Sequence, residues 1–159
     1  MKMNRSLVRM VFGIFVLLVS VSFAPAQEVQ VNLIITDPAQ AGEEVGLSKV
    51  VKGTASIPGG YHVWVLISLE DYEGQWWPQK DGVINPKTKE WAVRANFGSE
   101  TDVGAMFSIA AIVVDDKEHV KLKAYRKTAI ANEKWPSIDM PPTVGAPQII
   151  EVKKVSHSK

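Results

Sequence analysis

The segment YHVWVLISL, at residues 61–69, decides the fold. It is rich in β-branched and aromatic residues, which favour strands. Successive side chains of a strand point to opposite faces of a sheet, so Tyr61, Val63, Val65 and Ile67 share one face and His62, Trp64, Leu66 and Ser68 share the other. Both faces are largely apolar. This predicts a central strand that is covered on one face by a second sheet and partly covered on the other.

Similar patterns recur along the rest of the chain, separated by turn signals such as Pro58-Gly59-Gly60. They predict further strands at residues 28–36, 49–56, 76–79, 91–97, 106–114 and 148–155. Pro78 limits its short strand to the edge of a sheet, because proline cannot donate to a ladder. We therefore predict an all-β fold, an immunoglobulin- or fibronectin-like β-sandwich of about seven antiparallel strands.

One segment before the last strand has a different pattern. Residues 117–131 are rich in helix formers, and Asp115 or Asp116 can cap a first turn there. We predict one short helix at about residues 116–131, packed against one edge of the sheets. A strand remains the alternative, because the apolar side chains of this segment also alternate in Val120, Leu122 and Ala124.

Residues 1–26 have the pattern of a secretory signal peptide. Basic residues precede an apolar stretch at 10–23, and a small-x-small cleavage site ends at Ala26. The apolar stretch is too short to span a bilayer comfortably. Cleavage leaves residues 27–159 as a single β-sandwich domain, exported to the periplasm or the extracellular medium without stable membrane insertion. An uncleaved N-terminal anchor remains the alternative.

The composition excludes several function classes. The chain has 18 Lys and Arg against 17 Asp and Glu, and this near-neutral balance gives no reason to expect a nucleic-acid partner. It has no cysteine, which excludes disulfides, thiolate metal sites and a cysteine nucleophile. We find no glycine loop that would hold a phosphate group. We therefore expect no cofactor.

The sequence also lacks the motifs of common hydrolases, G-x-S-x-G and H-E-x-x-H. Its three histidines, His62, His119 and His157, lie far apart in the chain, and we interpret them as unrelated. The acidic clusters at 70–73 and 115–118 fit solvated charge and helix capping better than a calcium site or a glycosidase pair. We expect no catalytic residue and no metal site; an enzyme would require His62 to meet a carboxylate and a nucleophile in a cleft.

Aromatic side chains gather in the loop at residues 70–79. Flat aromatic rings stack on sugar rings and on peptide prolines, and carboxylates accept hydrogen bonds from hydroxyl groups. Adjacent side chains of an extended segment point to opposite sides, so one of the two neighbouring tryptophans faces outward while the other enters the core. The predicted ligand- or partner-binding residues are Trp76, Trp77, Tyr72, Glu70 and Asp71.

Two further tryptophans are predicted to be core residues. Trp91 is in phase with the apolar side chains of its strand. Trp135 begins a proline-rich segment, residues 135–147, which is too apolar for a flexible linker and is predicted to lie extended across the body of the protein.

The pattern G-x-x-S-I-P-G-G-Y-x-V-W-V, followed by W-P-Q, a strand with one tryptophan and an apolar F-x-I strand, resembles a class of secreted bacterial β-sandwich modules. The matching residues are Gly53, Ser56 to Tyr61, Val63 to Val65, Trp77 to Gln79, Trp91 and Phe107 to Ile109. The resemblance covers about two-thirds of the chain, from about residue 50 to residue 155. It implies an immunoglobulin-like accessory domain without known catalysis.

We predict a non-catalytic, extracytoplasmic binding module that recognises a glycan, a peptide or a partner protein through the loop at 70–79. The expected partner is an envelope protein or a polysaccharide. The alternative is a structural subunit of a cell-envelope assembly, in which an edge strand at 28–36 or 148–155 pairs with the sheet of a partner.

Overall fold

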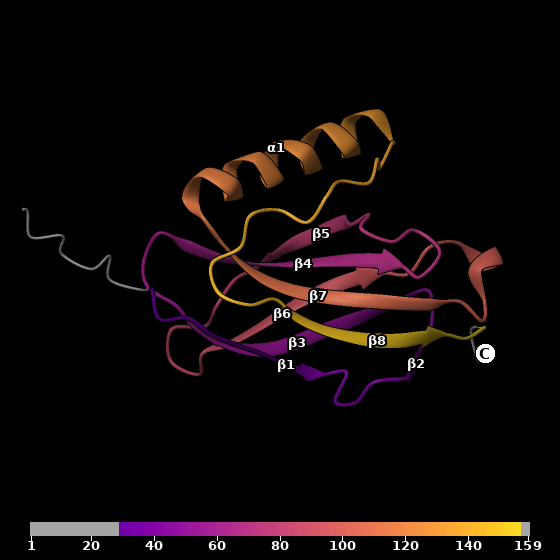
Figure 1. The fold of residues 1–159 in the computed structure, drawn as a ribbon, viewed down its shortest axis with the longest axis horizontal. Coiled ribbons are helices and arrows are strands. Elements are labelled where there is room, and N and C mark those ends of the chain that lie inside the picture. Colours follow the sequence, from indigo (N-terminus) through magenta and orange to yellow (C-terminus); the bar gives the residue numbers. More distant parts are fainter. Residues whose placement is uncertain (1–28, 157–159) are drawn as a thin grey trace, which may run out of the picture.

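The computed structural model describes residues 29–156, which form two packed β-sheets and one long helix (Figure 1). The expected signal peptide at residues 1–26 lies outside the described residues. Within residues 29–156, no helix is both long and apolar enough to cross a membrane.

Eight strands make up the two sheets. The smaller sheet has the order β1-β3-β6, and the larger sheet has the order β2-β8-β7-β4-β5. The strand bounds are Asn32–Asp37 (β1), Glu43–Val45 (β2), Ser48–Ser56 (β3), Tyr61–Leu69 (β4), Trp77–Gly82 (β5), Glu90–Asn96 (β6), Met106–Asp115 (β7) and Gln148–Lys154 (β8). Neighbouring strands are antiparallel except for β2 and β8, which are parallel.

This strand order is that of an immunoglobulin-like sandwich. In that fold the first, second and fifth strands share one sheet, and the third, sixth and seventh share the other. Here β1, β3 and β6 take the first set of places, while β4, β7 and β8 take the second, with β5 added beside β4. The predicted all-β sandwich is therefore confirmed. The short strand β2, whose three residues include two glutamates, was not among the predicted strands.

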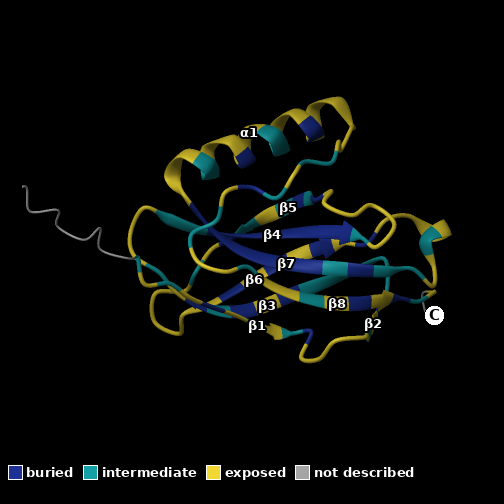
Figure 2. Ribbon diagram, viewed as in Figure 1, coloured by how far each residue is buried: buried dark blue, intermediate teal, exposed yellow. Residues whose placement is uncertain are grey.

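The main core lies between the two sheets (Figure 2). It is built from alternate residues of the strands, as the period of two requires. Trp91 of β6 is 2% exposed and lies over Gly53 of β3, which confirms the prediction that Trp91 belongs to the core. Gly53 keeps regular pairing with Ile35 and Trp91, so its role is to leave room for the indole ring.

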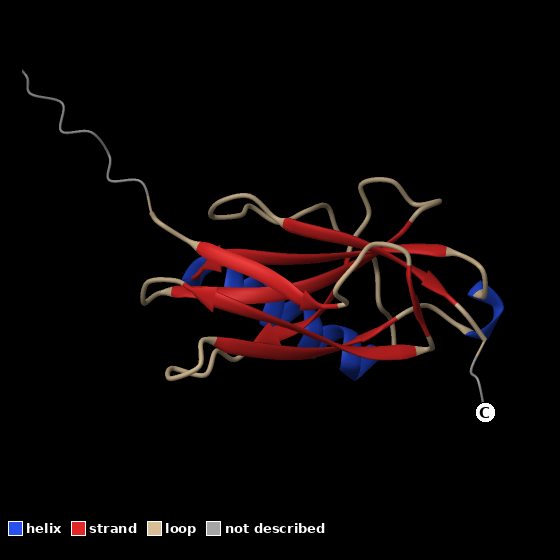
Figure 3. Ribbon diagram, turned by 90° about the horizontal axis from the view of Figure 1, so that it is seen from below, coloured by secondary structure: helices blue, strands red, loops and turns tan. Residues whose placement is uncertain are grey.

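A second core covers the outer face of the larger sheet. Helix α1, Asp116–Asn132, lies across β4, β5 and β7 on the side away from the smaller sheet (Figures 1 and 3). It begins after Asp115, whose side chain accepts a hydrogen bond from the amide of Glu118. The predicted helix is confirmed, but its expected position at a sheet edge is wrong. The buried residues of this second core are Trp64, Leu66, Trp76, Ala110, Ile112, Val114 and Leu122.

Residues 133–147, which we call the strap, return from α1 to β8 across the same face. Tyr125 of α1 donates a hydrogen bond to the carbonyl oxygen of Pro136 at 2.7 Å. Trp76 and Ile138 exchange two backbone hydrogen bonds, at 2.8 and 2.9 Å, which tie the strap to the start of β5. The helix, the strap and the segment before β5 therefore form one connected layer.

The alternative function, a structural subunit that pairs an edge strand with a partner, depends on which strands form the edges of the two sheets. β1 is an edge strand, as expected. β8 is not, because it lies between β7 and the short strand β2. β5, which contains Pro78, forms the other edge of the larger sheet, as the proline predicted.

Candidate functional site: an aromatic pocket and a histidine pair

An open pocket of about 670 Å³ lies at the end of the sandwich beneath the C-terminal half of α1. Its walls come from β5, the end of β6, the 3₁₀ turn η1 (Glu100–Asp102), the helix and the strap. Apolar side chains of β4 and β7 line part of it: Ile67, Leu69 and Phe107. The fold thus brings segments that are far apart in the chain around one concave surface.

Besides the buried Phe107, three aromatic side chains border this pocket: Tyr72, Trp77 and Trp135. Tyr72 and Trp77 meet edge to face, with ring centroids 5.8 Å apart and an interplanar angle of 82°. The indole Nε1 of Trp77 donates a hydrogen bond to the carbonyl oxygen of Trp135 at 3.0 Å, which fixes the ring against the strap. Tyr72 is 47% exposed and Trp135 is 45% exposed. The aromatic rings at this pocket are therefore held by contacts within the protein and still offer surface that a ligand can reach.

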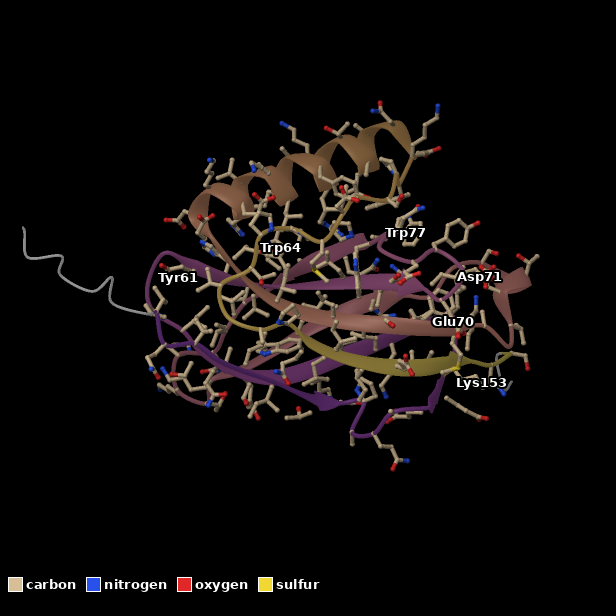
Figure 4. All side chains as sticks on the ribbon, in the orientation of Figure 1. Tyr61, Trp64, Glu70, Asp71, Trp77 and Lys153 are labelled. Atoms are coloured by element: carbon tan, nitrogen blue, oxygen red, sulfur yellow. The ribbon has the colours of Figure 1, made fainter. Side chains whose placement is uncertain are left out.

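The two adjacent tryptophans diverge because the chain is extended where β5 begins. Trp76 is 9% exposed and packs in the second core, whereas Trp77 is half-buried and lines the pocket. Figure 4 shows Trp77 between β5 and the layer that contains α1. Of the two tryptophans, Trp77 is therefore the one that a ligand in this pocket can reach.

Gln79 adds polar groups and links the two sheets at the pocket. The register of β4 and β5 shifts between Val65–Lys80 and Leu66–Pro78, which leaves Gln79 as the extra residue of a bulge. Such bulges redirect a side chain. Here the Gln79 amide oxygen accepts a hydrogen bond from the amide of Asn96 at 3.0 Å, and its nitrogen donates to the carbonyl oxygen of Trp77 at 3.0 Å.

Two charged side chains line the pocket on different elements. Arg126 of α1 lies with its guanidinium 5.7 Å from the centre of the Trp135 ring, a cation–π arrangement. Asp102 of η1 accepts hydrogen bonds from the amide and the hydroxyl of Ser99, and these bonds lower the pKa of its carboxyl below the ordinary 3.8. The nearby Lys154 lowers this pKa further. The pocket therefore offers one cation and one ionised carboxylate.

The sequence singled out five residues, and the structure places them differently. Tyr72 and Trp77 meet at the pocket. Glu70 and Trp76 instead line a smaller hollow of about 350 Å³. Asp71 is exposed at the turn after β4, at the same end of the sandwich (Figure 4).

Sequence reasoning missed the other residues of the pocket. The prediction that Trp135 belongs to the core is wrong, because the side chain is 45% exposed and lines the pocket. Arg126, Gln79 and Asp102 carry no local signal, because only the fold brings them together. Arg126 could have been noted as the one arginine of an otherwise lysine-rich helix.

A second cluster lies at the opposite end of α1. The expectation that the histidines are unrelated is wrong for two of them: the rings of His62 and His119 stack with centroids 3.7 Å apart. His62 Nε2 lies 2.6 Å from Asp116 Oδ1, and Trp64 Nε1 donates to His119 Nδ1 at 3.0 Å. They meet because His62 points outward from β4, under the first turn of the helix. His157 lies outside the described residues.

This histidine pair anchors the helix to the sheet. Within residues 29–156, the two rings form their hydrogen bonds with Asp116 and Trp64 and not with a hydroxyl group, so the parts of a serine- or threonine-based dyad are not brought together. The same part of the chain holds no group of three or more His, Cys, Asp or Glu side chains placed to bind a metal ion.

Comparisons with known proteins add little to these observations. No family model matches the sequence, and no curated protein matches it. A solved structure of murine CRIg aligns with 81% of this chain and 99% of its own, at 8% sequence identity and a TM-score of 0.29. At that score the match supports no conclusion, and the assignment of the fold rests on the strand order.

We expect His119 to make the free energy of unfolding depend on pH. Burial lowers the pKa of His119 below its ordinary value of 6.5; His62 and Lys123 lower it as well, whereas Asp81 and Asp116 raise it. The unfolded chain therefore binds more protons between the two pKa values, and the free energy of unfolding rises with pH through that window. We expect the free energy of unfolding, measured by urea titration, to fall as the pH is lowered below about 6.5.

His119→Gln is the matched variant, since it keeps a side-chain oxygen that can accept from Trp64 and does not titrate. This variant should lose the part of the pH dependence of the free energy of unfolding that His119 contributes. The same pH dependence in the wild type and the variant would contradict this role of His119.

Proposed function

We propose that this protein is an exported, non-catalytic binding module that holds a sugar unit of a glycan in the aromatic pocket. The observation that carries this proposal is that Tyr72, Trp77 and Trp135 place their rings around the pocket of about 670 Å³. Sugar rings have apolar C–H faces that stack on aromatic rings. Trp77 and Tyr72 are held at right angles to one another, so they can contact a face and an edge of the same ring.

The polar groups of the pocket support a ligand with many hydroxyl groups. Gln79 and Asn96 bring amide groups to the wall, and Asp102 brings an ionised carboxylate. An ionised carboxylate accepts hydrogen bonds and does not donate them, so it suits the hydroxyl groups of a sugar. A rigid sheet positions these groups at its end, which is the usual arrangement for recognition.

The proposed location depends on the leader expected at residues 1–26 and not on the fold. Export would place the pocket where envelope and extracellular polysaccharides occur. Immunoblotting of cell fractions, with the size of the exported form measured by mass spectrometry, tests both the export and the cut after Ala26.

Trp77→Ala tests the pocket itself. We expect the variant to lose binding, because truncation of a central aromatic anchor costs about 2 kcal/mol or more, roughly a thirtyfold rise in Kd. The measurement is affinity electrophoresis through gels that contain galactan, xylan, polygalacturonate or alginate, followed by calorimetry on any polymer that slows the protein.

Two controls separate binding from folding. Trp77→Phe keeps an aromatic face but loses the hydrogen bond to Trp135, so it should bind more weakly than the wild type and more tightly than Trp77→Ala. Thermal melts of both variants show whether the fold is retained. Equal retardation of the wild type and Trp77→Ala, or no retardation of the wild type in any of the gels, would contradict the proposal.

A further inference from the structure

We propose that the aromatic pocket selects an acidic sugar unit, a uronate, whose carboxylate binds the guanidinium of Arg126. This inference rests on the proposed function and adds the chemical class of the ligand. It comes from the position, the surroundings and the ionic partners of Arg126.

Arg126 brings a positive charge into the pocket without a carboxylate beside it. The side chain is half-buried, and it lies over the Trp135 ring at 5.7 Å. The ion pairs within residues 29–156 involve Lys49, Lys52, His62 and Lys121, and Arg126 takes part in none of them. A ligand carboxylate would therefore meet a cation with no protein anion to displace.

The geometry of the guanidinium suits a carboxylate. A guanidinium that rests on an aromatic ring keeps its N–H groups in the plane of its edge, and these can form two parallel hydrogen bonds to one carboxylate. Because the cation–π contact with Trp135 favours this position of the guanidinium, less side-chain freedom is lost on binding. The main chain at Trp135 is itself tied to the pocket, because its carbonyl oxygen accepts a hydrogen bond from the Trp77 indole.

The net charge of α1 also favours an anionic ligand. The helix carries five basic side chains, Lys117, Lys121, Lys123, Arg126 and Lys127, against two acidic ones, Asp116 and Glu118. Both acids lie in the first turn, at the end away from the pocket. The half of the helix above the pocket is therefore positive and attracts an anionic polymer.

Asp102 fixes the orientation of the sugar. Its carboxyl is ionised, with a lowered pKa and hydrogen bonds from Ser99, and would repel a second carboxylate. It comes from η1, whereas Arg126 comes from the helix, so the two charges belong to different walls. The uronate would turn its carboxylate to Arg126 and its hydroxyl edge to Asp102, with its ring against Trp77.

Methyl esterification provides the sharpest test, because it removes the charge of the polymer and leaves its backbone intact. The probes are polygalacturonate and alginate, each paired with its methyl-esterified form, with galactan and xylan as neutral polymers. The proteins are the wild type, Arg126→Gln and Lys127→Gln. Lys127 is the neighbouring exposed cation outside the pocket, so its variant is a matched loss of one charge.

We expect the wild type to bind at least one acidic polymer about tenfold or more tightly than its ester, as a charge-assisted hydrogen-bonded pair requires. Arg126→Gln should lose this preference and still bind the ester, whereas Lys127→Gln should keep it. Equal binding of acid and ester by the wild type, or an unchanged preference in Arg126→Gln, would overturn this inference and leave the glycan-binding proposal standing. No retention on any of the acidic, esterified or neutral polymers would overturn both.

Discussion

Trp64→Ala is expected to lower the free energy of unfolding by about 3–5 kcal/mol, the range for large buried aromatic side chains. Trp64 is 0% exposed and lies between the larger sheet and α1 (Figure 4). Its Nε1 is also the hydrogen-bond donor to His119 on the helix. The substitution therefore leaves a cavity and removes one polar link between the two layers. The measurement is urea unfolding followed by far-ultraviolet circular dichroism.

Trp64→Phe separates these two contributions. It keeps most of the apolar contact and removes only the donor, so it should cost about 1 kcal/mol from the lost hydrogen bond plus a smaller packing loss. If Trp64→Ala costs less than Trp64→Phe, or less than about 1 kcal/mol, then the helix is not anchored through this residue. Ligand binding in the pocket gives a second readout of the position of α1, because Arg126 lies on this helix and lines the pocket.

Gly53→Ala is expected to destabilise the sandwich by about 3 kcal/mol, at the upper end of the usual range for overpacking. A β-carbon at this position would overlap both the carbonyl oxygen of Ile34 and the six-membered ring of Trp91. The carbonyl belongs to the paired strand β1, and the ring is held in the main core, so neither can move freely. Thermal and urea unfolding both measure the effect.

Gly59→Ala is the matched control. No atom lies within 4 Å of its would-be β-carbon, so the same added methyl group meets open space. This variant should be neutral or slightly more stable, by up to about 1 kcal/mol, through a less flexible unfolded chain. Equal losses of stability in Gly53→Ala and Gly59→Ala would show that the packing of the Trp91 indole does not require a glycine at position 53.

The sequence predicted those parts of the fold that depend on local patterns. The two apolar faces of residues 61–69 predicted a strand covered on one face and partly on the other, and β4 contributes to both cores. The aspartate before α1 predicted its start, because a cap is a contact between near neighbours. The short strand β2 was missed, since a three-residue pairing with β8 leaves no periodic signal.

The candidate site was predictable only where it follows the chain. Alternation at Trp76 and Trp77 correctly indicated that the two side chains diverge. It could not indicate that Arg126 and Trp135 would join Trp77, because these contacts depend on how α1 and the strap lie across the sheet. The contacts of His62 with the helix are unpredictable for the same reason. Asp116, its hydrogen-bond partner in the first turn of α1, lies 54 positions away in the chain.

The second core has a consequence for how such a protein can change during evolution. In a simple two-layer sandwich, the outward side of each sheet faces water and accepts polar residues freely. Here Leu66, Ala110 and Ile112 on that side are apolar and buried beneath α1 and the strap, the segment inserted between β7 and β8. Deletion of this inserted segment alone would expose an apolar surface that is prone to self-association. A soluble form of this domain without the inserted segment would therefore need polar residues at the positions beneath it.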